Sequence, residues 1–131
     1  MIGSTNTLTE VPIKKYCQYD GTNYINKGFT VSNSTSYSIT IPNGVTTIKV
    51  TIESYCKANT SNASIANSVV AYLNGAEVVA IKYGGNNATY QGATLTATRI
   101  ISVKVGDVIT LESGKNTKVT NSDNILIVEE I

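Results

Sequence analysis

Apolar and polar residues alternate along much of this chain with a period of two, which is the period of a β-strand. The stretch SYSITIPNGVTTIKVTIES, residues 36–54, shows the alternation most clearly. Pro42–Gly44 interrupts it with turn chemistry, because Pro presets φ and Gly accepts a positive φ. We therefore predict two strands joined by this turn, with Ile39 and Ile41 in one row before it and Ile48, Val50 and Ile52 in one row after it.

A second pair of strands is predicted over SVVAYLNGAEVVAIKY, residues 68–83. Its two apolar runs flank Asn74-Gly75, which is the strongest short signal for a β-hairpin. Neither arm has a clearly polar face. We therefore expect a hairpin covered on both sides, as in a layered sandwich or at a subunit interface.

The stretch TRIISVKVGDVITLES, residues 98–113, places the step Gly106-Asp107 between two apolar runs. Such a step permits a tight reversal or a jump between sheets. The chain closes with NILIVEEI, residues 124–131, which predicts a last strand. Before the step, we expect one face of a strand to hold Ile101, Val103 and Val105, and after it we expect another to hold Ile109 and Leu111. In the last strand, one face should hold Ile125, Ile127 and Ile131, and the opposite face should hold Leu126 and Val128.

The remaining segments predict further strands and polar loops. VPIKKYCQY and TNYINKGFTV, residues 11–19 and 22–31, indicate strands joined by Asp20-Gly21, while residues 56–68, 84–94 and 113–124 are rich in Asn, Ser, Thr and Gly and predict loops. No stretch predicts a helix. The best candidate, NASIANSVVAYL at residues 62–73, carries β-branched residues that disfavour one. About eight short strands in one domain indicate an antiparallel sandwich or barrel. We expect a single domain over residues 11–131 after a flexible lead-in over residues 1–10.

The composition of the chain limits the classes of partner that it can bind. The chain has 10 Lys and Arg against 9 Asp and Glu, and its charged residues make up only 15% of the total. This balance offers no broad basic surface for nucleic acid and no polybasic membrane anchor. No apolar run is long enough to cross a bilayer. We therefore expect no nucleic-acid partner and no membrane insertion, and a neutral polar surface of this kind suits a particle exterior or a secreted protein.

Candidate chemistry is sparse. The chain has no His, which excludes Ser-His-Asp and Cys-His arrangements and removes the commonest transition-metal ligand. Glu129 and Glu130 are adjacent, so on a strand they point to opposite faces and cannot act as a paired acid and base. Residues 20–26 lack the spacing of a calcium loop. Cys17 and Cys56 predict two buried thiols, with a disulfide as the alternative. We expect no enzymatic activity, no cofactor and no metal.

Three segments carry a resemblance to known proteins. ITIPNGVTTIKVTIES, residues 39–54, resembles the early strands of phage tail-fibre and tail-tip domains. AYLNGAEV, residues 71–78, looks like the strand, Asn-Gly turn and strand of C1q-like and tumour-necrosis-factor-like jelly rolls. TRIISVKVGDVITLESG, residues 98–114, followed by a short apolar strand, is similar to the late strands of those jelly rolls, with Gly106-Asp107 at their recurring Gly-Asp position.

The resemblance spans about residues 36–131 and implies an all-β, two-sheet antiparallel jelly roll that assembles as a homotrimer. In phage, such domains sit at a tail tip or on the virion surface and contact host glycans or proteins. Animal members carry more aromatic residues than the one Phe, eight Tyr and no Trp found here, which weakens a metazoan assignment more than a viral one. The chain also lacks a collagen-like Gly-x-y stalk.

The candidate ligand contacts are Tyr83, Asn86, Asn87 and Tyr90. A Tyr ring can stack on a sugar face, and Asn side chains both donate and accept hydrogen bonds. These residues lie in or beside a polar loop, and loops on a rigid sandwich are where binding usually resides. The other reading is that a given Tyr simply packs in the core.

The function expected from these observations is a non-enzymatic adhesion module on a virion surface, such as the receptor-binding domain of a phage tail tip or fibre. It would recognise a host cell-surface glycan or protein. One alternative is a purely structural virion component, such as a head fibre or capsid decoration protein, that contacts other virion proteins. Another is a carbohydrate-binding or C1q-like module of a secreted bacterial protein.

Overall fold

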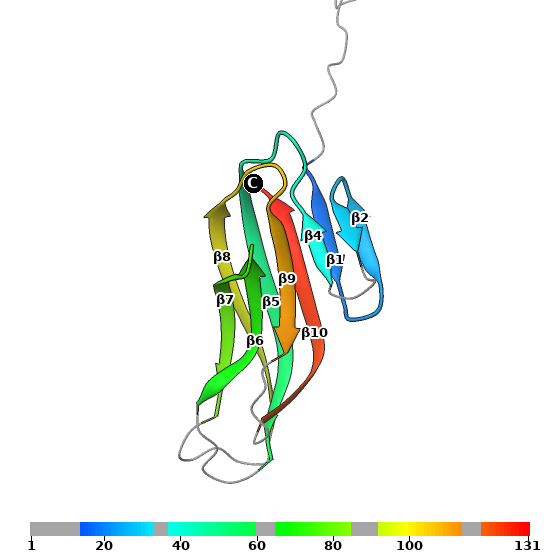
Figure 1. Ribbon diagram of the computed structural model, residues 1–131. Helices are drawn as coiled ribbons and strands as arrows, with labels where there is room; N and C mark the ends of the chain where they lie inside the picture. The colour runs from blue at the N-terminus through cyan, green and yellow to red at the C-terminus, as the bar shows by residue number, and fades with distance from the viewer. Residues whose placement is uncertain (1–13, 33–36, 60–64, 85–91, 114–118) are drawn as a thin grey trace, which may run out of the picture.

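The computed structural model describes residues 14–32, 37–59, 65–84, 92–113 and 119–131 (Figure 1). The expected lead-in over residues 1–10 lies outside them. Within the described residues the chain forms ten β-strands and no helix. The strands are β1 (Tyr16–Tyr19), β2 (Tyr24–Lys27), β3 (Thr30–Ser32), β4 (Ser38–Thr40), β5 (Thr47–Ala58), β6 (Ala66–Leu73), β7 (Ala76–Tyr83), β8 (Ala93–Ser102), β9 (Val108–Ser113) and β10 (Val119–Glu130). This part of the chain therefore holds no helix that could cross a bilayer.

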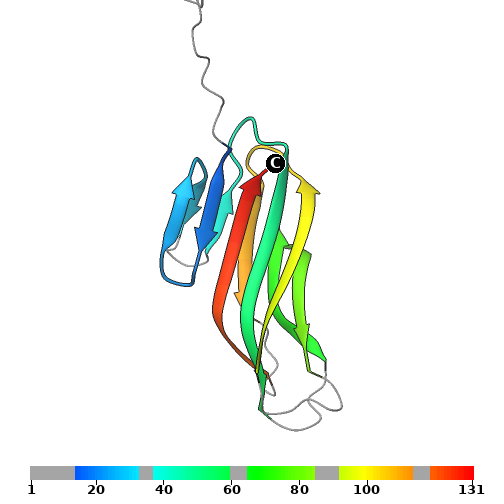
Figure 2. The same cartoon turned by 180° about the vertical axis from the view of Figure 1, so that it is seen from behind.

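The strands form two stacked antiparallel sheets of five (Figures 1 and 2). The first sheet has the order β2-β1-β10-β5-β8, and the second has the order β3-β4-β9-β6-β7. From β4 onward every connection except the β6–β7 hairpin crosses from one sheet to the other. This arrangement confirms the predicted two-sheet antiparallel jelly roll, and it shows that the Gly106-Asp107 step is a jump between sheets.

The core lies between the sheets and uses the rows that the alternation predicts. β5 has the burial pattern of a strand with one covered face over its whole length. Its inward residues face those of β6 and β7 in the other sheet. The fully buried members of these rows include Ile39, Ile48, Val50, Ile52, Ile109 and Val128, each 0% exposed, with Leu126 at 1%.

The β6–β7 hairpin differs from its prediction in one arm. β6 is buried on both faces over Ser68–Ala71, as expected. β7 alternates instead, with buried Val79 and Ile81 facing the core and exposed Glu77 and Lys82. The outer face of β7 therefore carries exposed charged side chains. β7 is also the edge strand of its sheet.

The strand before the Gly106-Asp107 step ends earlier than predicted. Val103 still packs against the core as Ile101 does, whereas Val105 leaves the predicted row. β8 stops at Ser102, and Val105 is 62% exposed. The reason lies in the hydrogen bonds of the following turn. Asp107 N donates to Lys104 O at 3.1 Å, and Lys104 N donates to the Asp107 carboxylate at 3.0 Å, which closes the chain on itself.

Other element bounds also shift. The expected strand over residues 22–31 divides into β2 and β3, which lie in different sheets, because Gly28 adopts a positive φ of 93° between them. The expected loops over residues 56–68, 84–94 and 113–124 are shortened by the ends of β5, β6, β8 and β10. β10 carries a bulge between Ser122 and Ile125, where Asp123 has a positive φ of 53°.

Candidate functional site

The first candidate surface is the outer side of the β2-β1-β10-β5-β8 sheet. Strand register places its side chains in rows across the sheet, since directly opposed residues share a face. One row runs Ile25, Gln18, Ile127, Thr51 and Thr98, and the next runs Lys27, Tyr16, Glu129, Lys49 and Ile100. We call this surface the isoleucine face, defined by Ile25, Ile100, Ile125, Ile127 and Ile131.

The isoleucine face combines exposed aliphatic side chains with polar and charged ones. Ile25, Ile100 and Ile131 are 63%, 59% and 51% exposed. Lys49 Nζ lies 3.6 Å from Glu129 Oε2, so two of the charges on the face pair with each other. The Thr98 hydroxyl donates to the Thr51 hydroxyl at 3.2 Å. Several exposed large aliphatic side chains on one side of a sheet are typical of a contact surface for another protein.

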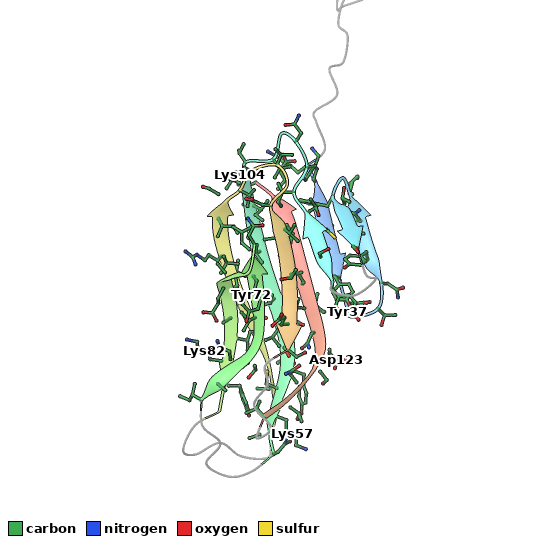
Figure 3. All side chains as sticks on the ribbon, viewed as in Figure 1. Tyr37, Lys57, Tyr72, Lys82, Lys104 and Asp123 are labelled. Carbon is green, nitrogen blue, oxygen red and sulfur yellow. The ribbon has the colours of Figure 1, made fainter. Side chains whose placement is uncertain are left out.

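The second candidate surface is a group of three tyrosines, which we call the tyrosine cluster: Tyr19, Tyr24 and Tyr37. The β1–β2 hairpin sets Tyr24 opposite Tyr19, and their ring centroids lie 4.7 Å apart. Tyr37 enters from the other sheet, just before β4, and stacks on Tyr19 with centroids 4.4 Å apart and ring planes 28° apart. Figure 3 shows Tyr37 at the end of the small lobe that these strands form.

Exposure rises across the cluster. Tyr19 is 1% exposed, Tyr24 is half-buried and Tyr37 is 42% exposed. The Tyr24 hydroxyl donates to Ser32 O at 3.1 Å. The Tyr19 hydroxyl is buried, and no hydrogen bond to it has acceptable geometry among the described residues. Burial is the main cause that raises the pKa of Tyr19 well above its usual range, followed by the neighbouring Tyr37 hydroxyl.

Asp20 adds a carboxylate beside the cluster. Its Oδ1 accepts hydrogen bonds from Thr22 N at 3.0 Å and Asn23 N at 2.8 Å, which closes the β1–β2 turn. These backbone donors, Asn23 first, lower the pKa of Asp20, so the carboxylate is ionised at neutral pH. Asp20 follows Tyr19 directly in the chain, and its charge is the smallest of the causes that raise the pKa of Tyr19. The cluster thus combines aromatic rings, a buried hydroxyl and an anion.

A third feature lies at the pole of the sandwich where Figure 3 labels Lys104, and three loops meet there. Asp107 is 7% exposed and accepts from Asn74 Nδ2 at 2.9 Å. A shallow hollow of about 270 Å³ beside it is lined by Ser102, Val103, Lys104 and Asp107. Both carboxylate oxygens already accept hydrogen bonds, Oδ2 from Lys104 N. The Asp107 carboxylate therefore has a structural role, which is to join these loops.

The predicted contacts fall mostly outside the described residues. Tyr83 ends β7, where it is half-buried and packs against the core, opposite Ala66. Asn86, Asn87 and Tyr90 lie in the segment that the structure does not describe. Their role as ligand contacts stays a prediction. The packing of Tyr83 agrees with the alternative interpretation, in which a tyrosine packs against the core and binds no ligand.

Sequence reasoning missed the tyrosine cluster, and part of it was within reach. Asp20-Gly21 was recognised as the join between two strands, and a hairpin closing there sets Tyr19 opposite Tyr24. Tyr37 was out of reach, because its contact with Tyr19 depends on how two sheets stack. No group of three Asp, Glu, Cys or His side chains in the described part of the chain is close enough to hold a metal ion.

Comparison with known proteins identifies the fold. No protein-family model and no curated protein matches the chain. The solved structure of GITRL from bushbaby matches at a TM-score of 0.55 and 10% identity, over 91% of this chain and 95% of that one. GITRL from pika matches at 0.53 and 10%, over 90% and 95%. A family 35 carbohydrate-binding module from an environmental isolate covers 87% of this chain and 96% of its own at 14% identity, but its TM-score of 0.34 supports no argument.

The two GITRL structures therefore establish a tumour-necrosis-factor-like jelly roll, which is the fold that the sequence resemblance implied. At 10% identity the likeness reaches the fold alone.

Proposed function

We propose that this chain is a non-enzymatic adhesion module on a bacteriophage virion, at a tail tip or fibre, which assembles as a homotrimer and binds a glycan or protein on the host cell. The jelly-roll fold and the resemblance of residues 39–54 to phage tail-fibre strands support this proposal. The observation that carries the assembly is the isoleucine face.

A second and a third copy of this chain are the occupants that suit the isoleucine face. Its exposed isoleucines, Ile25, Ile100 and Ile131, gain from burial against another protein surface. Thr51 and Thr98 bond to each other, which satisfies part of the polar content of the face without a ligand. The Lys49–Glu129 pair leaves no net charge at its centre. The face therefore fits a surface of the same neutral character.

Assembly would serve adhesion through multivalency. Three copies hold three sets of weak binding contacts at fixed spacing, so the second and third contacts form at a high effective concentration. This gain needs no strong individual site, which agrees with the low charge and shallow relief of the described surface.

The oligomeric state tests the assembly. Light scattering during size-exclusion chromatography should give the mass of a trimer for the unchanged chain. Ile100→Asp combined with Ile127→Asp should release monomers, because charges would be buried at the interface. The matched control is Val105→Asp, which changes an equally exposed apolar residue in the 103–107 loop. A monomer at the highest soluble concentration would contradict the assembly.

Binding to cells tests adhesion separately. The fluorescently labelled protein should bind saturably to at least one strain in a panel of bacteria. If no strain binds it while the protein still attaches to purified phage particles, the chain is a structural virion component, and adhesion is disproved.

A further inference from the structure

We propose that the tyrosine cluster, together with Asp20, is a binding subsite for a neutral pyranose sugar. This proposal deepens the adhesion function above and rests on it, since it names the class of ligand and the residues that take it. The site is distinct from the predicted loop contacts Tyr83, Asn86, Asn87 and Tyr90, and it lies in the small lobe formed by β1, β2, β3 and β4 (Figures 1 and 3).

The first argument is the stacking surface. Tyr19 covers one face of the Tyr37 ring, so the exposed 42% of Tyr37 includes the opposite face and the ring edge. The Tyr19 contact, and the Tyr24 ring beyond it, hold Tyr37 in place. A rigid aromatic ring of this kind presents a flat apolar surface at low entropic cost, and the axial C–H groups of a pyranose fit such a surface.

The second argument is unmet hydrogen-bonding capacity. Both backbone donors of the turn bond to Oδ1 of Asp20, and no described donor bonds to Oδ2. An ionised carboxylate oxygen can accept from two neighbouring sugar hydroxyls, and hydrogen bonds to a charged group are the strong ones.

The third argument is contrast with the isoleucine face. That face presents aliphatic side chains and threonines that bond each other, which suits another protein surface. The tyrosine cluster instead combines ring, hydroxyl and carboxylate at one place. This combination of an apolar plane with hydrogen-bonding groups at its side suits a sugar, which has an apolar face and a rim of hydroxyls.

Tyrosine fluorescence measures the binding directly, because the chain has eight Tyr and no Trp. The probes are glucose, galactose, mannose, rhamnose and N-acetylglucosamine, each titrated as a free monosaccharide and as short oligosaccharides. We expect a saturable change in emission for at least one probe, with shifts of the Tyr19, Tyr24 and Tyr37 ring resonances in NMR spectra.

Three variants and a control separate the contributions. Tyr37→Ala should weaken binding about tenfold by removing the stacking ring, whereas Tyr37→Phe should keep most of it. Asp20→Asn should weaken binding while preserving the turn, since an Asn oxygen can still accept from Thr22 N and Asn23 N. The matched control is Tyr55→Ala, because Tyr55 is 38% exposed on the isoleucine-face side of its sheet. Circular dichroism and thermal unfolding confirm that each variant folds.

The outcomes distinguish this proposal from the adhesion function. Cell binding that is equal in Tyr37→Ala and the unchanged protein would overturn the sugar subsite and leave adhesion intact. The loss of cell binding in Tyr37→Ala without competition from any saccharide would assign the cluster to a protein ligand and also overturn the proposal. No saturable response to any probe, in fluorescence or in NMR, would do the same.

Discussion

Asn74 and Asp107 are 33 residues apart in sequence and form a hydrogen bond, in which Asn74 Nδ2 donates to Asp107 Oδ1 at 2.9 Å. The same amide accepts from Val108 N at 2.9 Å, and the other carboxylate oxygen accepts from Lys104 N at 3.0 Å. In addition, Ile41 N donates to Asp107 O at 2.8 Å. The β6–β7 hairpin, the β8–β9 crossing and the segment after β4 are thus joined at one point.

This arrangement predicts loss of stability in acid. The hydrogen bond from the Asn74 amide, followed by that from Lys104 N, lowers the pKa of Asp107 below its ordinary value. The folded protein therefore gains stability above the unfolded pKa of about 3.9, and this gain disappears as the pH falls through the lower folded pKa. Asp107→Asn should lower the urea midpoint at neutral pH and flatten its decline toward about pH 3.

The control for this experiment is Glu112→Gln, which neutralises an exposed carboxylate at the end of β9. It should leave both the midpoint and its pH dependence close to those of the unchanged protein. An Asp107→Asn protein whose midpoint falls with acid as steeply as before would show that other carboxylates govern the acid response.

Truncation in the core should be costly. Ile52 is 0% exposed at the centre of β5, so Ile52→Ala should lower the free energy of unfolding by about 2–5 kcal/mol through lost burial and a residual cavity. Val105→Ala, on the exposed 103–107 loop, should change it by less than about 0.5 kcal/mol. Chemical denaturation of both variants measures the difference, and similar values would place Ile52 outside the core.

The two cysteines should behave as inert thiols. Cys17 and Cys56 are both free and buried, which confirms the prediction of two thiols over a disulfide. Burial raises the pKa of the Cys17 thiol to about 11, so at neutral pH it is protonated and a poor nucleophile. Iodoacetamide should label neither thiol in the folded protein and both after denaturation, as read by mass spectrometry. Labelling that required a reductant as well as denaturation would show a disulfide instead.

The bulge in β10 should tolerate Gly and reject a β-branched residue. Asp123 has a positive φ of 53°, which Gly adopts freely and Val adopts at a cost of about 1–2 kcal/mol. The bulge also lets Asn124 reach inward, where its Oδ1 accepts from the buried Ser54 hydroxyl at 2.5 Å. Thermal unfolding should therefore show Asp123→Gly equal to or above the unchanged protein and Asp123→Val several degrees below it. The reverse order would mean that the side chain of Asp123 makes the turn.

The success and failure of the sequence reading have physical causes. Alternation with a period of two reports which face of a strand is buried, so the rows of β5 and the end of β10 were predictable. Asn74-Gly75 has local turn chemistry, and the turn forms there. The end of β8 was not predictable, because it depends on the turn that follows, where Asp107 bonds to Lys104 and to Asn74, 33 residues away in sequence.

The candidate site divides in the same way. The pairing of Tyr19 with Tyr24 follows from a local hairpin. The contact of Tyr37 with Tyr19 depends on how the two sheets stack, and the spacing of residues in the sequence does not indicate it. Likewise, the isoleucine face becomes visible only when the register brings Ile25, Ile127 and Ile100 onto one side of a sheet.

The two ends of the described chain meet at one pole of the sandwich. Glu130 N donates to Lys15 O at 2.9 Å and Ile131 N donates to Thr47 O at 3.1 Å, and both views show the C-terminus beside the start of β1 (Figures 1 and 2). An affinity tag or biosensor linker attached at either end would therefore orient the molecule alike. The pole where β5 ends and β8 begins would point into the solution, so immobilisation through either end presents the same surface to an analyte.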